Sequence, residues 1–581
     1  MPIDFRNTNL VWTSILAETL HLLGLTTAII CPGSRSAPLA IAFANHPEIE
    51  AIPVLDERSA AFFALGLARQ SKRPIVLVCT SGTAGANFYP AVIEARESGV
   101  SLVVFTADRP PELRDCNAGQ AIDQQKLYGH YPNWQVELAL PSLEESMLAY
   151  LRQTVIHAWE RSLYPVPGPV HLNLPFRDPL APLPQPEAEA LAKTFDQESF
   201  FAAVVPLPPT LIAFPPTPLP TLPSFPPHGL IIAGPAQPPE PEHYCRAIAH
   251  LSRTLSYPVL AEGLSPLRNY ANLNPNLIST YDLILRNPTL AEKLQPEAVI
   301  RLGEMPTSKQ LRTWLATIQP RQWVVDTSGR NLDPLHGKTT NLHLSIETFA
   351  KLVSSSAKPT SSYLELWRVA EAQARRVLDQ TMAETEFLFE CKVAWLLSKV
   401  LPPETPLFIS SSMPVRDVEF FWMPRNSKIK PFFNRGVNGI DGSLSTALGI
   451  AHRQQSSVML TGDLALLHDT NGFLLKSQFS GHLTIVLIDN NGGGIFEMLP
   501  ISQFEPPFET FFATPQSVNF AQLCTTYGIG HELITSWNQL ERRLKSLPSE
   551  GIRVLEIRTG RKADALWRQN NLEALAASLT I

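Results

Sequence analysis

The sequence has little charge for its length and no concentration of positive charge. Only 17% of its 581 residues are charged, and the formal net charge is −6. A protein that binds nucleic acid usually carries a basic patch, and none is visible, so we expect no nucleic-acid partner. Any anionic ligand must then be bound by a few individually placed cations.

Cysteines are few, and long apolar runs are absent. The six cysteines are scattered and form no CxxC pair, which argues against a disulfide framework or a zinc site and favours a reducing compartment. No apolar run approaches the ~18 residues of a membrane span, and residues 1–20 predict an amphipathic helix instead of a signal peptide. We therefore expect a cytoplasmic protein with no membrane partner.

Apolar residues are plentiful, and they alternate between strand and helix patterns. They make up 44% of a sequence that is too long for one core. Short apolar runs such as residues 74–79 (PIVLVC) and 101–106 (SLVVFT) are separated by helical stretches of about ten to fifteen residues, which is typical of βαβ units with parallel sheets. The predicted fold class is α/β, with three domains of parallel-sheet architecture.

Two stretches interrupt this alternation. Proline crowds residues 179–227, and we expect an extended, semi-rigid connector there that cannot sustain a helix. A recruitment site for a proline-binding module is the alternative. A second linker is predicted at SSSAKPTSS. The predicted boundaries are a first domain at 1–180, a proline-rich linker at 181–228, a central domain at 229–353, a linker at 354–365 and a third domain at 366–581.

The strongest chemical signal lies at the ends of two predicted strands in the third domain. One strand, SVML, leads to Gly462 and Asp463, and the next, LTIVLID, leads to Asn490 and Gly492. In a parallel sheet both ends lie at the edge where ligands bind, so Asp463 and Asn490 are expected to be neighbours.

These residues suit Mg²⁺ and a diphosphate. Asp463 supplies a carboxylate, Asn490 an amide oxygen and Gly492 a backbone carbonyl, and phosphate oxygens complete the shell. Gly462 is expected to permit a tight turn, and the helix that starts after Asp463 favours anionic phosphates. Mn²⁺ is an alternative metal. Without a ligand, Asp463 could simply cap a helix and Asn490 begin an ordinary turn.

The segment from Gly462 to Asn490 resembles the signature of thiamine-diphosphate enzymes, an initial Gly-Asp-Gly followed by a double Asn. Leu464 replaces the second glycine, a departure shared by the menaquinone-pathway branch. The resemblance implies thiamine diphosphate as cofactor. It also implies a glutamate at a strand end of another domain, which binds the aminopyrimidine ring and promotes its imino tautomer. Glu57 fits that role, although alone it could merely complement a helix dipole. Such enzymes are at least homodimers, and some are tetramers, with sites at the subunit interface.

Further motifs narrow the resemblance and cover nearly the whole chain: CPGSRS at 31–36, DER at 56–58, TSGTAGANFYPAVIEA at 80–95, TADRPPELRDC at 106–116, RGVNGIDG at 435–442 and NNGGGIFEMLP at 490–500. Together they resemble the 2-succinyl-5-enolpyruvyl-6-hydroxy-3-cyclohexene-1-carboxylate synthases of menaquinone and phylloquinone synthesis. The resemblance implies decarboxylation of 2-oxoglutarate on the cofactor, followed by 1,4-addition of the succinic-semialdehyde carbanion to isochorismate.

Arginines are the expected partners of these carboxylate-rich substrates, because a guanidinium group binds a carboxylate through two parallel hydrogen bonds. Arg35, Arg416 and Arg435 stand at ligand-facing ends and match the substrate-binding arginines of the family; each alone could be a surface ion pair. Ser34 and Gln120 are expected to bind substrate or intermediate, with Ser34 and Arg35 also counted as catalytic. Lys309 matches a central-domain lysine, but a solvated lysine at a helix start is the alternative.

The remaining predicted contacts are to the cofactor and around it. Ile440, after Gly439, matches the apolar residue that props thiamine in its bent conformation, and Ser412 and Met413 are expected beside the cofactor rings. An apolar wall that excludes water is predicted from the residues after the metal turn; it comprises Ile495, Phe496 and Leu499. Two positions depart from the family: Gly119 replaces an Asn, and Gly494 replaces a longer polar residue.

Two alternatives stay open. Another thiamine-diphosphate 2-oxoacid decarboxylase or carboligase, such as acetohydroxyacid synthase, would share Glu57 and the metal motif but would not need three arginines. A silent regulatory homologue on the same scaffold cannot be distinguished by fold, but it would have no need for Glu57. A dinucleotide-binding enzyme is disfavoured because no strand is followed by GxGxxG.

Overall fold

The computed structural model describes residues 3–206, 225–353 and 361–580. These residues form three six-stranded sheets in which every described strand pairing is parallel. The predicted α/β class with three parallel-sheet domains is confirmed. No helix in the described ranges combines the length and apolar character that crossing a bilayer requires.

The first sheet, sheet A, has the strand order β2-β1-β3-β4-β6-β5. Its strands are β1 (Thr27–Ile30), β2 (Glu50–Pro53), β3 (Ile75–Cys79), β4 (Leu102–Asp108), β5 (Trp134–Glu137) and β6 (Pro169–Pro175). Its helices are α1 (Thr8–Leu23), α2 (Ala37–Ala44), α3 (Glu57–Ser71), α4 (Ala84–Asn87), α5 (Tyr89–Ser98), η1 (Pro111–Leu113), α6 (Glu145–Leu163), α7 (Pro186–Leu191) and α8 (Gln197–Phe201).

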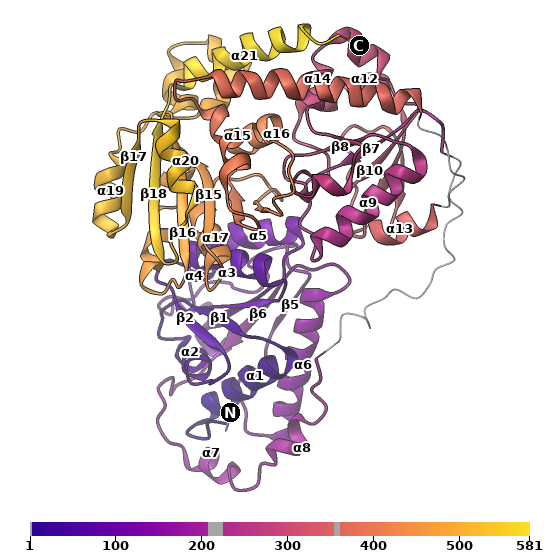
Figure 1. Cartoon of the computed structure of the whole chain (residues 1–581). Coiled ribbons are helices and arrows are strands. Elements are labelled where there is room, and N and C mark those ends of the chain that lie inside the picture. Colours follow the sequence, from indigo (N-terminus) through magenta and orange to yellow (C-terminus); the bar gives the residue numbers. More distant parts are fainter. Residues whose placement is uncertain (1–2, 207–224, 354–360, 581) are drawn as a thin grey trace. The chain divides into compact units, whose positions relative to one another are not determined.

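Helices cover both faces of sheet A (Figure 1). Helices α1, α2 and α6 bury apolar side chains against one face, and α3 packs against the other. The helix predicted near the N-terminus is present as α1, but its amphipathic description is wrong. Twelve of its sixteen residues are buried, because its Ser and Thr hydroxyls bond to backbone carbonyls and need no solvent.

The expectation of an extended connector fails for residues 186–201, which contain α7 and α8. Proline starts α7 at its first helical position, where the N–H that proline lacks would have no partner in the helix. Asp196 caps α8 by accepting a hydrogen bond from Ser199 N–H. Ala188 and Phe200 bury their side chains in the core of the first domain. The densest proline stretch, residues 207–224, lies outside the described residues, as does any recruitment site in it.

The second sheet, sheet B, has the order β12-β11-β10-β7-β8-β9. Its strands are β7 (Gly229–Ala233), β8 (Val259–Ala261), β9 (Leu277–Ile278), β10 (Ala298–Leu302), β11 (Arg321–Val325) and β12 (Lys338–Leu342). Its helices are α9 (Pro241–Leu255), η3 (Pro266–Asn269), η4 (Ala271–Leu273), α10 (Tyr281–Leu285), α11 (Pro288–Lys293), α12 (Lys309–Ile318) and α13 (Ile346–Leu352).

The third sheet, sheet C, has the order β14-β13-β15-β16-β18-β17. Its strands are β13 (Pro406–Ile409), β14 (Lys430–Phe432), β15 (Ser457–Gly462), β16 (His482–Asp489), β17 (Gly530–Ile534) and β18 (Gly551–Arg558). The helices of this part are α14 (Ser362–Glu384), α15 (Glu390–Val400), α16 (Met413–Phe421), α17 (Ser443–Ala451), α18 (Asp463–Leu467), η5 (Thr470–Ser477), η6 (Gly494–Met498), η7 (Pro500–Gln503), η8 (Glu509–Ala513), α19 (Phe520–Tyr527), α20 (Trp537–Lys545) and α21 (Arg561–Ala577).

Helix α14 corrects the second predicted linker. It begins at Ser362, four residues inside the predicted linker, and runs for 23 residues that the sequence analysis missed. Ser361 caps it, and apolar residues at helical spacing, including Trp367 and Leu378, bury one face in the core. The rest of that linker, residues 354–360, lies outside the described residues.

By internal contacts the chain forms two compact units. One contains the first domain together with Asn434–Arg453 and His468–Ser480, and the other contains sheets B and C. Within the first unit, α17 crosses α3 at two glycines. A Cβ on Gly66 would lie 2.1 Å from the Thr446 carbonyl oxygen, and a Cβ on Gly449 would lie 2.2 Å from that of Phe63, so only glycine permits this approach.

Candidate cofactor and substrate site

The carboxyl edge of sheet C brings the predicted metal ligands together. Strands β15 and β16 pair in register through Gly462 and Ile488, which places Asp463 beside the turn that follows β16. Asp463 Oδ2 accepts a 2.7 Å hydrogen bond from Gly492 N–H, and its Oδ1 accepts one of 2.8 Å from Leu464 N–H. The carboxylate therefore holds the turn while its remaining lone pairs stay available to a cation.

The turn after β16 requires glycine at its third position. Gly492 has a φ of +131°, and a Cβ there would lie 2.3 Å from the Ala513 carbonyl oxygen. Gly462 is different. Its φ is not positive and a Cβ would meet no atom within 4 Å, so the turn from β15 into α18 does not require glycine at this position. What Gly462 provides is open space at the strand end, beside Asp463.

Asn490 presents a buried oxygen that a cation could bind. Its side-chain nitrogen donates a 3.0 Å hydrogen bond to Glu390 Oε2, which turns its Oδ1 the other way. That oxygen is buried and has no hydrogen-bond partner. A buried amide oxygen without a partner is costly, and a bound Mg²⁺ would satisfy it. The donor set present, one carboxylate, one amide oxygen and a turn with open space beside it, fits the metal and diphosphate.

The electrostatics of Asp463 agree with this fit. Burial, aided by the charges of Asp489 and Glu390 and opposed by the two backbone hydrogen bonds, raises its pKa to about 6. An adjacent cation would favour the ionised form. Within the described residues no group of three or more His, Cys, Asp and Glu side chains could hold a metal. A site of this kind, with one carboxylate, is found through its backbone motif.

The segment that follows β13 carries the other predicted contacts of sheet C. Ser412 has a φ of +76°, a strained conformation for a residue other than glycine, and Met413 is buried at the start of α16. Arg416 Nη1 donates a 2.6 Å hydrogen bond to the Ser412 carbonyl oxygen. One turn of α16 therefore ties a predicted substrate-binding arginine to the strained residue.

The predicted apolar wall follows the metal turn on η6. Ile495 and Phe496 are partly buried, whereas Leu499 is 44% exposed. The Phe496 ring meets the Phe512 ring edge-on, with 5.9 Å between their centroids. Arg561 braces this segment, because its Nε lies 3.0 Å from Glu497 Oε1 and its Nη2 bonds to Glu509.

At the carboxyl edge of sheet A, Glu57 is the first residue of α3, which begins after a short turn that follows β2. Asp56 caps this helix by accepting a 3.1 Å hydrogen bond from Ser59 N–H. Burial raises the pKa of the Cys31 and Cys79 thiols, and the Glu57 charge raises both further. Glu57 therefore lies near the ends of β1 and β3, at the edge where ligands of such sheets bind.

The loops at this edge present Ser34 and Gln120, and both residues are exposed. Gln120 has a φ of +59° and donates from Nε2 to the Ser81 carbonyl oxygen at 3.0 Å. Arg109 joins the loop after β3 to the loop that carries Gln120. Its Nη1 donates to Ser81 Oγ at 2.7 Å and its Nη2 to the Gly119 carbonyl oxygen at 2.8 Å.

The predicted cations differ in how they are held. Arg35 Nη1 donates to the Phe176 carbonyl oxygen at 2.9 Å and lies 3.7 Å from Asp178, while its buried Nε has no partner. Burial lowers the Arg35 pKa, and the charge of Arg109 lowers it further. Lys309 is exposed at the first position of α12, which leaves both interpretations of it open.

The turn with Arg435, Gly439 and Ile440 is anchored by a residue that the sequence analysis did not single out. Glu94 is buried, and its carboxylate accepts from Gly436 N–H at 3.0 Å and from Val437 N–H at 2.9 Å. Arg69 Nη2 bonds to Glu94 Oε1 at 2.9 Å and neutralises it. Ile440 is partly buried within this turn.

Comparisons with known proteins agree with this geometry over the whole chain. Residues 12–127 match the N-terminal thiamine pyrophosphate binding domain, 226–409 the middle domain and 419–557 the C-terminal thiamine pyrophosphate binding domain of thiamine pyrophosphate enzymes. A 2-succinyl-5-enolpyruvyl-6-hydroxy-3-cyclohexene-1-carboxylate synthase from Trichormus variabilis is 63% identical, with 99% of each chain covered, and one from Trichodesmium erythraeum is likewise 63% identical.

The chain belongs to this synthase family. The sequence-based resemblance is confirmed, and thiamine diphosphate is the cofactor of the matched domains. Among solved structures, a benzoylformate decarboxylase from Polynucleobacter necessarius has a TM-score of 0.65 at 14% identity, covering 95% of this chain and 98% of its own. At that identity the likeness establishes the fold alone.

In this member of the synthase family, four residues that support the site were missed from sequence: Arg109, Glu94, Glu390 and Arg561. Glu390 and Arg561 contact the site from distant chain positions and belong to no local motif, so they become visible only in the folded chain. Arg109 and Glu94 stood inside the quoted motifs 106–116 and 80–95, which was the one available signal.

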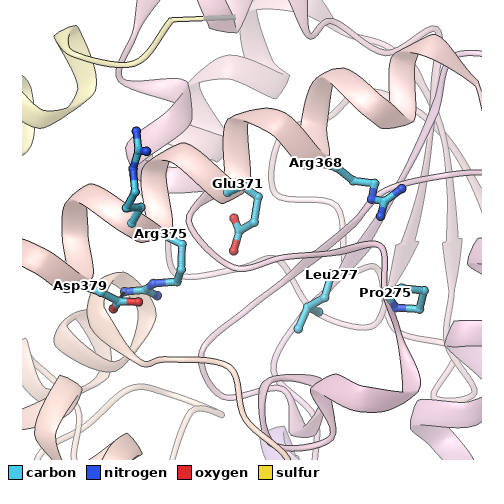
Figure 2. A pocket seen from close by; sticks show the side chains of 8 residues that line it. Pro275, Leu277, Arg368, Glu371, Arg375 and Asp379 are labelled. Atoms are coloured by element: carbon cyan, nitrogen blue, oxygen red, sulfur yellow. Dashed lines mark ion pairs between the residues drawn. The ribbon is translucent and has the colours of Figure 1, made fainter.

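A separate surface cavity of about 410 Å³ holds none of the predicted site residues (Figure 2). Helix α14 supplies most of its lining, and the charges there are largely paired. Arg375 Nη2 lies 2.8 Å from Asp379 Oδ1, and the Glu371 carboxylate accepts from Ser279 and Thr280. We assign no ligand to it.

Proposed function

We propose that this chain decarboxylates 2-oxoglutarate and adds the resulting succinic-semialdehyde carbanion to isochorismate by 1,4-addition. The products are CO₂ and 2-succinyl-5-enolpyruvyl-6-hydroxy-3-cyclohexene-1-carboxylate. The observation that carries the proposal is the carboxyl edge of sheet C, with the buried, unpartnered Asn490 oxygen beside Asp463. Relatives of more than 60% identity over nearly the full chain bear the name of this synthase.

Asp463, Asn490 and the Gly492 carbonyl are the proposed ligands of Mg²⁺, with Mn²⁺ as an alternative, and the metal would hold the diphosphate. Thiamine diphosphate, when bound, supplies the nucleophilic C2 carbon at which a 2-oxoacid is decarboxylated. Glu57 is the proposed proton holder at the aminopyrimidine ring, where its position after β2 presents the carboxylate at the sheet edge. Further proposed cofactor contacts are Ser412, Met413, Gly439, Ile440, Gly462 and Leu464.

Proposed substrate contacts are mostly cationic, since both substrates carry carboxylates and an unpaired buried carboxylate is costly. Arg35, Arg416 and Arg435 are proposed to bind these carboxylates through paired hydrogen bonds. Backbone carbonyl oxygens brace the guanidinium groups of Arg35 and Arg416. Ser34, Gln120 and Lys309 are the proposed polar contacts. The proposed wall that excludes water comprises Ile495, Phe496 and Leu499.

The assembly and the compartment are also proposals. A homodimer or tetramer is supported by the family resemblance, which implies sites at the subunit interface. A cytoplasmic location is supported by six cysteines that form no disulfide.

The test is an assay with thiamine diphosphate and Mg²⁺, with 2-oxoglutarate present and with isochorismate either added or omitted. Loss of isochorismate absorbance that depends on 2-oxoglutarate and on the cofactor is the expected result. Decarboxylation without consumption of isochorismate would instead favour another 2-oxoacid enzyme, such as an acetohydroxyacid synthase. No turnover despite cofactor binding would favour a silent homologue.

A further inference from the structure

Glu390 is buried at the first position of α15, far in sequence from every predicted ligand. Its two carboxylate oxygens have different partners. Oε2 accepts the 3.0 Å hydrogen bond from the Asn490 amide nitrogen, and Oε1 accepts from Arg568 Nη1. The guanidinium of Arg568 also bonds through Nη2 to Asp417 Oδ1 at 2.6 Å. Asp417 stands on α16, next to Arg416.

The two ends of an asparagine amide are nearly alike in shape but opposite in hydrogen bonding. Its oxygen can bind a cation, and its nitrogen can only donate. Because the Glu390 carboxylate accepts and cannot donate, it fixes the Asn490 nitrogen on its own side and leaves Oδ1 on the other. That Oδ1 is the buried oxygen without a partner.

We propose that Glu390 is a positioning residue that orients the Asn490 amide so that its oxygen faces the metal. The inference rests on the proposed function, because it assumes that Asn490 binds Mg²⁺. Arg568 prevents Glu390 from turning away, since it holds the other carboxylate oxygen and is itself held by Asp417. A partner of this kind commonly changes metal affinity by about 10- to 100-fold when it is replaced.

Gly494 supports the same role at the amide nitrogen. A Cβ at residue 494 would lie 2.8 Å from the Asn490 nitrogen, closer than real contacts of this kind. The glycine therefore leaves the space that the amide nitrogen occupies while it bonds to Glu390. A longer residue at this position would press the amide out of its orientation.

The main test exchanges donor and acceptor in the pair. In Glu390→Gln, the Gln oxygen stays with Arg568, so its nitrogen faces the Asn490 nitrogen and the Asn490 amide turns over. Mg²⁺ affinity, titrated in the presence of thiamine diphosphate, is expected to fall about 10- to 100-fold. Adding Asn490→Asp should recover most of this loss, because the Gln nitrogen then donates to a carboxylate. Asn490→Asp alone should stay weak, since it places two carboxylates together without a donor.

The matched control is Glu419→Gln. Glu419 lies on α16, and its buried carboxylate accepts a 2.5 Å hydrogen bond from Gly263 N–H. It should leave Mg²⁺ affinity within about 3-fold of wild type, a difference under 1 kcal/mol. Thermal unfolding without metal verifies that each variant is folded. If Glu390→Gln does not fold, Gly494→Ala tests the same amide and should also weaken Mg²⁺ binding.

A folded Glu390→Gln with wild-type Mg²⁺ affinity would overturn the proposal, as would a double variant no better than either single one. These titrations need no isochorismate. Failure of the wild-type protein to consume isochorismate would therefore count against the proposed function while leaving the metal result intact.

Discussion

The polar residues behind sheet A and those behind sheet C are different in kind. Behind sheet A the central residues are neutral: Thr106 Oγ1 bonds to His171 Nε2 at 2.8 Å and to Asn173 Oδ1 at 2.9 Å, and Gln124 links Asn173 to the Gly82 N–H of a site loop. All of these side chains are buried. The buried charge that this network contacts is Asp108, which accepts from Asn173 Nδ2 at 2.8 Å and is balanced by the partly exposed Arg114 at 3.1 Å.

Behind sheet C the network is ionic. Arg568 bonds to Glu390 and Asp417. Asp564 lies close enough that the charge of Glu390 raises its pKa and that of Arg568 lowers it. Burial raises the pKa of Asp417 and of Asp564 to about 7 in each case. Three buried acids therefore share one buried arginine, next to the turn proposed to hold a cation.

The difference follows from what each edge is proposed to hold. A divalent cation balances an excess of buried carboxylates, whereas removing one member of such a network leaves a buried charge unpaired. The edge proposed to bind the aminopyrimidine ring presents exposed loops that must keep a fixed conformation, and neutral hydrogen bonds are enough to hold them. Substitutions of the proposed ligands at sheet C, or of the ionic network that holds them, should consequently weaken metal binding. Substitutions at sheet A should affect turnover or folding and leave metal affinity unchanged.

Asp463→Ala tests the sheet C side of this comparison with the largest expected effect. It removes the proposed charged ligand and frees the Gly492 N–H, so Mg²⁺ affinity should fall by more than about 100-fold and turnover should be lost. Calorimetric titration of Mg²⁺ with thiamine diphosphate measures it. Asp489→Asn, at the end of the neighbouring strand, is the control, and equal losses in both variants would contradict the assignment.

Glu57→Gln tests the sheet A side. The amide keeps the shape but cannot hold the proton, so kcat should fall about 10²- to 10⁴-fold while cofactor binding is retained. Single-turnover assays and cofactor titration separate the two effects. Glu48→Gln, an exposed acid of the same domain, should behave as wild type. Unchanged turnover in Glu57→Gln would favour the silent homologue.

His171→Gln tests the neutral network through pH. Burial lowers the His171 pKa from 6.5 to about 3, so below pH 6.5 the unfolded chain binds a proton that the folded chain does not. Its contribution to stability is complete above pH 6.5 and is lost as the pH falls, by about 2 kcal/mol at pH 5. Urea unfolding at pH 8 and pH 5 should show a smaller acid loss in the variant. An equal loss would mean that His171 is not responsible.

Arg35→Lys has a smaller expected effect on substrate binding. Lysine keeps the charge but loses the fork and the bond to the Phe176 carbonyl, so KM for one carboxylate substrate should rise about 10-fold with little change in Mg²⁺ affinity. Steady-state kinetics with each substrate varied in turn measures it. Arg177→Lys, which alters an exposed ion pair with Glu112, is the control. A change in Mg²⁺ affinity would contradict the separation of metal binding at sheet C from the contacts at sheet A.

Local patterns explain what the sequence could predict. The strands and the positions of Asp463 and Asn490 follow from apolar runs that end in polar residues, and parallel pairing then brings the ends together. Glu390 and Arg568 could not be found this way, since their pairing joins residues 178 positions apart and depends on how α15 and α21 pack. The buried character of α1 and the helices at 186–201 also depend on tertiary contacts that outweigh local composition.

Gly119→Asn is expected to have the smallest effect, and it tests whether the sheet A loops are open. The residue has no positive φ, and a Cβ there would meet no atom within 4 Å, so the side chain fits without strain. The Gly119 carbonyl keeps its bond from Arg109 because the backbone does not move. We expect less than about a 3-fold change in kcat/KM, under 1 kcal/mol, and unchanged Mg²⁺ affinity. A large gain in substrate affinity would instead show that an Asn at this position supplies a contact that the glycine lacks. A large loss would mean that the loop closes on its ligand more tightly than its exposure indicates.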